Sequence, residues 1–173
     1  MNTCACWSCG AQSWRVSYEF GAYRLRVCRT CGLGCLYGDM PEPEVFYNMT
    51  YYASDDPQRG YGDYTALHTA LQRTMTNRMR RIERYLPQRG RLLDVGCGMG
   101  AALRVAHQRG WQAAGTEIAP DVVTRLRAQD LDVRQARAED LDERAAYDCI
   151  TMWDALEHVC DALAACAAAA RAL

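Results

Sequence analysis

Residues 91–100 decide the fold, and they read Arg91-Leu92-Leu93-Asp94-Val95-Gly96-Cys97-Gly98-Met99-Gly100. The first half is a short apolar run without a helical period, which predicts a buried central strand of a parallel sheet. Glycine then stands at every second position, and a residue without a Cβ allows both a sharp turn and the close approach of a ligand. Residues 101–106 read as a helix, so the turn lies at a helix N-terminus, where free backbone amides suit a carboxylate or a phosphate.

A second predicted strand, residues 112–117, ends in Glu117, which follows Gly100 by 17 residues. An acid at the tip of the second strand of such a unit can accept hydrogen bonds from both hydroxyls of a ribose. The order strand, glycine turn, helix, strand and acid therefore predicts a site for a cofactor that contains a nucleoside. The order alone does not identify that cofactor.

Two cofactor classes and a purely structural turn compete as interpretations of the glycines. The spacing Gly96-x-Gly98-x-x-Ala101 fits the relaxed dinucleotide fingerprint of NAD(P)-dependent oxidoreductases. The spacing Asp94-x-Gly96-x-Gly98-x-Gly100 resembles the first motif of class I S-adenosylmethionine-dependent methyltransferases. The second resemblance is favoured because Asp94 lies inside the strand, where the dinucleotide pattern asks for no acid. It is favoured also by Glu117-Ile118-Ala119-Pro120-Asp121, which looks like that family's acid with the loop and helix start after it, and by residues 147–159, which look like its fourth strand and following helix.

The resemblance implies an α/β fold, a Rossmann-like doubly wound sheet with strand order 3-2-1-4, and S-adenosylmethionine as the cofactor. Its amino-acid end is expected over the glycine turn and its ribose on Glu117. In the family an acid after the third strand often contacts the adenine, but Arg137 stands at that place, so Glu139, Asp140 or the backbone near Ala138 are the candidates. The expected cofactor-binding residues are Asp94, Gly96, Gly98, Gly100, Glu117, Ile118, Glu139, Asp140, Trp153 and Tyr64.

The first 38 residues predict a small zinc ribbon. Cys6-x-x-Cys9-Gly10 and Cys28-x-x-Cys31-Gly32 are two cysteine turns with 18 residues between them, and the intervening sequence alternates between apolar and polar residues as a hairpin does. Four thiolates in two such pairs can surround Zn²⁺ and leave no open position, so the metal is expected to be structural. Disulfides and unligated core thiols are the alternatives. Cys4 and Cys35 are spare: either can substitute as a ligand, or be a small buried or exposed thiol.

Catalytic residues are not identified, and His158 is a weak candidate near the carboxyl end of the fourth strand, which is expected at residues 147–153. A histidine there can act as a general base, or it can cap or pack the helix that is expected from Ala155 onward. The acceptor is expected to be a small molecule, since similar zinc-ribbon methyltransferases often act on small molecules such as sugars.

The predicted organisation is a zinc ribbon over residues 1–38, an aromatic-rich connector over residues 39–63, and the front part of a methyltransferase domain over residues 64–173. Tyrosines of the connector are expected either at the methionine end of the cofactor or between ribbon and main domain. Helices are expected at residues 65–86 and 121–129, and the third strand at 131–134. The chain supplies four strands where the family has seven, so a fragment or a truncated product is expected.

Composition excludes few functions. The chain has 173 residues and a net charge of −1, which gives no general attraction to nucleic acid or membranes. It lacks a signal pattern and an apolar run long enough to span a bilayer, so a cytoplasmic protein is expected, without indication of its oligomeric state. The alternative to an enzyme is a zinc-ribbon binding module that carries a non-catalytic Rossmann-like remnant.

Overall fold

The computed structural model describes residues 5–38, 43–52 and 67–173, which belong to two compact units. The first unit comprises Met1–Glu42 and the second Pro43–Leu173, so the boundary falls inside the predicted connector. Within the described residues, no helix combines the length and the apolar character needed to cross a membrane.

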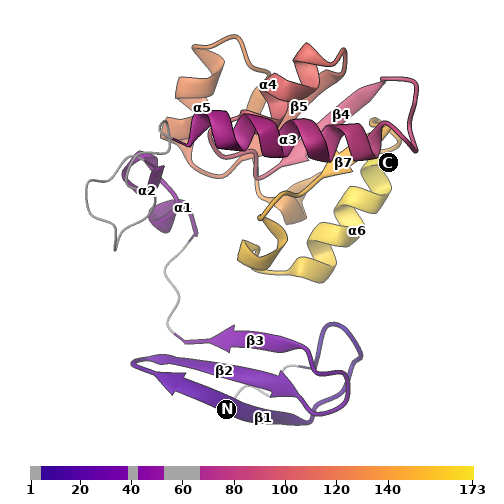
Figure 1. The fold of residues 1–173 in the computed structure, drawn as a ribbon. Coiled ribbons are helices and arrows are strands. Elements are labelled where there is room, and N and C mark those ends of the chain that lie inside the picture. The colour runs from indigo at the N-terminus through magenta and orange to yellow at the C-terminus, as the bar shows by residue number, and fades with distance from the viewer. Residues whose placement is uncertain (1–4, 39–42, 53–66) are drawn as a thin grey trace. The chain divides into compact units, whose positions relative to one another are not determined.

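The first unit holds a three-stranded antiparallel sheet in the order β1-β2-β3 (Figure 1). β1 (Trp14–Phe20) and β2 (Tyr23–Cys28) form the hairpin that the alternating sequence predicts, and β3 (Gly34–Tyr37) pairs with β2. Trp14 pairs with Cys28, so the second cysteine turn follows β2 at the end of the hairpin where β1 begins.

The second unit is built on a parallel sheet in the order β6-β5-β4-β7. The strands are β4 (Arg91–Val95), β5 (Gln112–Glu117), β6 (Val133–Gln135) and β7 (Cys149–Thr151). In chain order this is the predicted 3-2-1-4 arrangement, and the fold class is confirmed. The glycine turn follows β4 and Glu117 ends β5, and both therefore lie at the carboxyl edge of the sheet.

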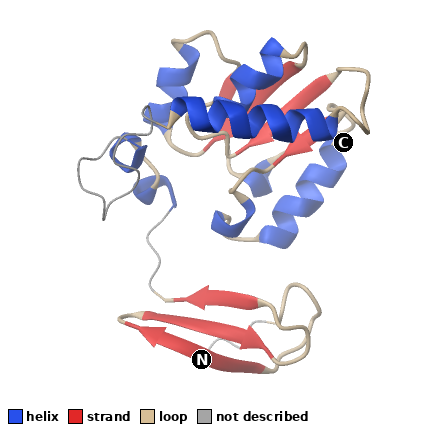
Figure 2. Cartoon of the chain, viewed as in Figure 1, coloured by secondary structure: helices blue, strands red, loops and turns tan. Residues whose placement is uncertain are grey.

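Helices flank both faces of this sheet (Figure 2). α3 (His68–Ile82), α4 (Ala101–Gln108) and α5 (Pro120–Arg127) contribute to one hydrophobic cluster, and α6 (Ala162–Ala172) contributes to the other. Two short helices, α1 (Pro43–Phe46) and α2 (Met49–Tyr52), precede them, and two 3₁₀ turns, η1 (Ala138–Asp140) and η2 (Leu156–His158), follow β6 and β7.

The central strand β4 is buried on both faces, as its continuous apolar sequence predicts. Leu92 lies in the cluster that contains Met79 of α3 and Leu103 of α4. Leu93 and Val95 lie in the cluster that contains Ala165 of α6. Asp94 shares the face of Leu92, because side chains alternate along a strand, and only 2% of its surface is exposed.

The expected helix from Ala155 onward is wrong. The chain makes only the single 3₁₀ turn η2 and then begins α6 at Ala162, because Asp161 caps this helix by accepting a hydrogen bond from the Ala164 amide (2.9 Å). α3 ends four residues earlier than expected, at Ile82, and the expected residues 65 and 66 lie outside the described ones. β6 covers residues 133–135 where 131–134 were expected, so it is displaced toward the C-terminus. β7 covers only residues 149–151 of the expected 147–153.

Candidate functional site

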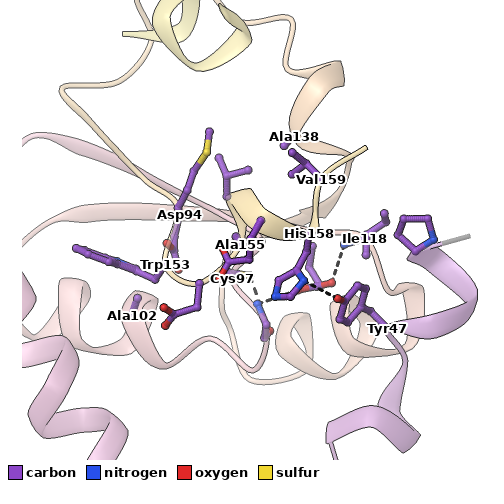
Figure 3. Close-up of a pocket in the computed structure, with 18 of the residues that line it drawn as sticks. Tyr47, Asp94, Cys97, Ala102, Ile118, Ala138, Trp153, Ala155, His158 and Val159 are labelled. Carbon is purple, nitrogen blue, oxygen red and sulfur yellow. Dashed lines mark hydrogen bonds between the residues drawn. The ribbon is translucent and has the colours of Figure 1, made fainter. Parts of the chain in front are cut away.

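A cavity of about 480 Å³ opens at the carboxyl edge of the parallel sheet (Figure 3). This volume lies in the range of small-molecule and cofactor sites. Its wall combines the glycine turn, the end of β5, η1, the segment after β7, one face of α3, and tyrosines of α2 and of the bend before it. Among the lining residues are Tyr47, Tyr52, Leu71, Met75, Asp94, Gly96, Gly98, Glu117, Ile118, Ala138, Glu139, Trp153, Asp154, Glu157 and His158.

The three glycines of the turn have different surroundings. All have positive φ, which is +69° at Gly96, +49° at Gly98 and +74° at Gly100. Gly96 and Gly98 line the cavity, and a Cβ on Gly98 would lie 3.4 Å from the Tyr52 hydroxyl. Gly100 lies outside the cavity wall, and a Cβ there would come within 2.9 Å of Leu131 Cδ1. The structure therefore accounts for Gly100 by the packing at the start of α4.

Glu117 is buried, with 3% of its surface exposed, and its carboxylate accepts three backbone hydrogen bonds. The Gly98 amide donates to Oε2 (2.8 Å), while the amides of Ile118 and Ala119 donate to Oε1 (2.8 and 3.1 Å). Backbone amide donors of this kind form strong hydrogen bonds with a carboxylate. Oε1 already accepts two of these bonds, whereas Oε2 accepts one and keeps a second lone pair, through which Glu117 can accept a hydrogen bond from a ligand hydroxyl in the cavity.

Asp94 is the second buried acid of the cavity wall. Its Oδ1 accepts a hydrogen bond from the Thr151 hydroxyl on β7 (2.7 Å). Burial raises the pKa of Asp94 to about 7, although the hydrogen bond from Thr151 opposes the shift, and the charge of Glu117 adds to it. At neutral pH Asp94 is therefore partly protonated.

Trp153 and Asp154 lie where β7 ends, as predicted. The Arg78 guanidinium of α3 lies over the Trp153 ring at 4.6 Å from its centre, and it pairs with Asp154 (3.3 Å). Trp153 Nε1 is buried and has no hydrogen-bond partner among the described residues.

An aromatic wall closes the cavity on the side of α1 and α2. The Tyr47 ring packs edge-on against Tyr51 (5.0 Å between centres), and Tyr51 packs against Tyr52 (5.2 Å). The Tyr47 hydroxyl lies 2.9 Å from His158 Nδ1 (Figure 3). These tyrosines come from the predicted connector and line the cavity, whereas the expected Tyr64 lies outside the described residues.

The expected adenine contacts have different positions. Ile118, Ala138 and Glu139 line the cavity, whereas Asp140 does not, although it belongs to the same 3₁₀ turn. Glu139 accepts a hydrogen bond from the Asp161 amide (2.9 Å), and this bond holds the carboxylate against the start of α6.

Sequence reasoning missed two groups of wall residues. Leu71 and Met75 lie at apolar positions of the helix expected at residues 65–86, and apolar periodicity does not distinguish a core contact from a cavity wall. Tyr47 was one of several connector tyrosines, and nothing in the sequence relates it to His158, which follows 111 residues later.

The first unit contains a candidate metal centre. The Sγ atoms of Cys6, Cys9, Cys28 and Cys31 all lie within 4.8 Å of one another, and the described cysteines are free thiols. The separations Cys6–Cys31 (3.6 Å) and Cys9–Cys28 (3.7 Å) match the spacing of about 3.8 Å expected for sulfurs bound at about 2.3 Å around a tetrahedral Zn²⁺.

The two cysteine turns repeat one backbone pattern. The Gly10 amide donates to the Cys6 carbonyl (2.6 Å), and the Gly32 amide donates to the Cys28 carbonyl (3.0 Å). Each turn therefore presents its pair of thiols in the same way, which suits the four-thiolate donor set of structural zinc sites.

Comparisons with known proteins identify the second unit. A family model described as a methyltransferase domain matches residues 67–173. A ubiquinone biosynthesis O-methyltransferase of Xanthomonas campestris pv. campestris is 35% identical over 82 residues, which are 43% of this chain and 34% of that protein. The namesake enzyme of Xanthomonas oryzae pv. oryzae is 35% identical over 91 residues, covering 48% of this chain and 38% of the relative. The chain thus spans about a third of the length of these curated relatives.

Solved structures agree on the fold. CalS10, an amino pentose methyltransferase from Micromonospora echinaspora solved with S-adenosylmethionine bound, superposes with a TM-score of 0.52 at 25% identity, covering 63% of this chain and 49% of that one. A putative S-adenosylmethionine-dependent methyltransferase from Methanococcus maripaludis gives 0.52 at 13% identity, covering 62% and 55%, and shows the fold alone.

Proposed function

The chain belongs to the methyltransferase-domain family, and from this membership we propose that its second unit binds S-adenosylmethionine in the cavity and contributes to methyl transfer onto a small-molecule acceptor. The observation that carries the proposal is the buried Glu117 carboxylate, held beside the glycine turn by three amides in the cavity wall. NAD(P) is the weaker alternative, since the matched family and relatives are methyltransferases.

The cavity wall fits this cofactor in its chemistry. Glu117 would hold the ribose hydroxyls, and the backbone at Gly96 and Gly98 would face the amino-acid end. Ile118 and Glu139 would line the adenine side, and the Trp153 ring is a further part of the wall. When bound, S-adenosylmethionine supplies a methyl group on a positively charged sulfur, and the acceptor takes it in line. The protein's part is then orientation and exclusion of water.

For the acceptor, we propose a small molecule that carries an O–H or N–H group. The relatives support this class only in general terms, because their names cover a ubiquinone-pathway O-methyltransferase and an amino pentose methyltransferase. His158 is proposed as the general base for that proton, since its ring lies on the cavity at the end of the segment that follows β7.

In the first unit, we propose one structural Zn²⁺ held by Cys6, Cys9, Cys28 and Cys31. The four-thiolate set and the sulfur spacings support this metal. Four protein ligands leave no coordination position for a substrate, so the ion would contribute to folding rather than to chemistry.

Calorimetric titration of the full chain with S-adenosylmethionine and, separately, with NAD tests the proposed cofactor. We expect binding of S-adenosylmethionine, and a roughly 10- to 100-fold weaker affinity in Glu117→Gln, which removes one charged acceptor. Asp140→Asn is the matched control, since Asp140 lies off the cavity wall, and its affinity should equal that of the wild type. Binding of NAD without S-adenosylmethionine, or an unchanged affinity in Glu117→Gln, would refute the proposal.

A further inference from the structure

The contact between Tyr47 and His158 indicates a role for this pair beyond lining the cavity. Tyr47 Oη lies 2.9 Å from His158 Nδ1, and the two rings meet at 5.5 Å between centres and an angle of 61°. Both residues line the cavity, and Figure 3 shows the hydroxyl and the imidazole turned toward one another. The phenol therefore interacts with one ring nitrogen, and Nε2 is the nitrogen left for a ligand.

Hydrogen bonds anchor the chain on both sides of Tyr47 in the sequence. On the N-terminal side, Glu44 of α1 accepts a hydrogen bond from Arg137 Nε (2.6 Å). On the C-terminal side, the Met49 amide at the start of α2 donates to Asp121 Oδ2 (2.8 Å). These two bonds tie the segment of Tyr47 to the loop after β6 and to the start of α5, so the hydroxyl is a fixed partner for the imidazole.

The direction of the hydrogen bond between Tyr47 and His158 decides which tautomer His158 presents to the cavity, because a phenol hydroxyl can donate or accept. In a neutral imidazole one nitrogen donates and the other accepts, and the partner of one nitrogen sets the state of the other. If Nδ1–H donates to Tyr47 Oη, Nε2 keeps its lone pair toward the cavity. The same bond persists when the ring becomes an imidazolium, because the phenolic oxygen goes on accepting from Nδ1–H.

Building on the proposed function, we infer that Tyr47 is a positioning residue that holds His158 as the Nδ1–H tautomer, so that Nε2 accepts the proton of an O–H or N–H acceptor. The acceptor atom forms its bond to the methyl carbon with its own lone pair, the C–S electron pair goes to sulfur, and the X–H proton goes to Nε2. His158 is exposed, so the imidazolium returns this proton to solvent. The Tyr47–His158 pair would therefore favour acceptors with an O–H or N–H proton over acceptors that have no proton to lose.

The tautomer can be measured on the full chain by long-range ¹H–¹⁵N correlation spectroscopy. The sequence has three histidines, which keeps the spectrum simple. His107 is an internal reference, because its Nε2 lies 2.9 Å from the Ala113 carbonyl and must donate to it. We expect the opposite tautomer for His158, and a mixture of both tautomers in Tyr47→Phe. Tyr85→Phe is the matched control, since Tyr85 is 86% exposed and lies off the cavity.

Two outcomes would overturn the inference. One is an Nε2–H tautomer of His158 in the wild type, and the other is an unchanged His158 spectrum in Tyr47→Phe. The affinity for S-adenosylmethionine, measured in parallel, separates this failure from that of the proposed function, since loss of cofactor binding in the wild type would refute the latter alone. Catechol and glucosamine serve as O–H and N–H probes, and methylation of either should fall at least tenfold in His158→Asn and less in Tyr47→Phe. Equal rates for wild type and His158→Asn would also contradict the inference.

Discussion

Replacing Asp94 by Asn should change how the stability of the second unit depends on pH. Asp94 lies in the central strand, is almost fully buried, and is bonded to the Thr151 hydroxyl. Burial raises the pKa of this carboxyl to about 7, whereas in an unfolded chain it is about 3.9. Asparagine has nearly the shape of the protonated acid but carries no titrating proton, so the variant isolates the contribution of ionisation.

The size of the effect follows from linkage. Between about pH 4 and pH 7 the unfolded chain is ionised at this position while the folded chain keeps its proton, so the folded state binds more protons. A raised pKa gives stability that is fully present below the unfolded value and is lost as the pH rises through the folded value. A shift of about 3 pH units corresponds to roughly 4 kcal/mol. The wild type should therefore lose about this much between pH 4 and pH 8 through Asp94, and Asp94→Asn should not.

Urea unfolding at several pH values, with zinc in excess and without cofactor, provides the measurement. Fluorescence of the buried Trp111 reports on the second unit. The free energy of unfolding of Asp94→Asn relative to the wild type should rise by about 4 kcal/mol from pH 4 to pH 8. Asp142→Asn, at an exposed acid, is the control and should differ from the wild type by less than about 0.5 kcal/mol throughout. A difference between Asp94→Asn and wild type that does not vary with pH would refute the reasoning.

Two further predictions concern the glycine turn and the metal centre. Gly98→Ala should weaken the affinity for S-adenosylmethionine at least tenfold in calorimetry. The added methyl group would lie 3.4 Å from the Tyr52 hydroxyl in the cavity wall, and the φ of +49° at this position is unfavourable for alanine. An unchanged affinity would show that no ligand approaches this backbone. Elemental analysis should find one Zn²⁺ per chain, retained in Cys35→Ser and lost from Cys9→Ser, and chelation should abolish the circular dichroism of the antiparallel sheet; full zinc retention in Cys9→Ser would contradict the four-thiolate site.

The position of the glycine turn could be predicted because it depends on local patterns, whereas the sheet order was predicted from the resemblance to methyltransferases. Apolar runs without helical period, glycines at alternate positions and an acid at the end of the next strand are all legible within about 30 residues. The cysteine spacing likewise predicts that Cys6, Cys9, Cys28 and Cys31 lie close together, as they do in the structure.

What the sequence could not predict depends on distant contacts. The Tyr47–His158 pair joins the bend between α1 and α2 to the turn after β7, and no periodicity links residues that far apart. Gly100 was grouped with its neighbours by spacing alone, although the side chain it accommodates, Leu131, belongs to the segment before β6. The helix expected from Ala155 begins instead at Ala162, because the side chain of Asp161 caps it there, and apolar periodicity does not show which polar residue will act as the cap.

The two-sided burial of β4 has a consequence for deuterium exchange. Its amides pair with β5 or β7 in the middle of the parallel sheet, between two hydrophobic clusters. Such protons reach solvent only when the whole unit opens. Their exchange rates should therefore measure the global unfolding free energy of residues 43–173, independently of the cysteine-rich sheet at the other end of the chain.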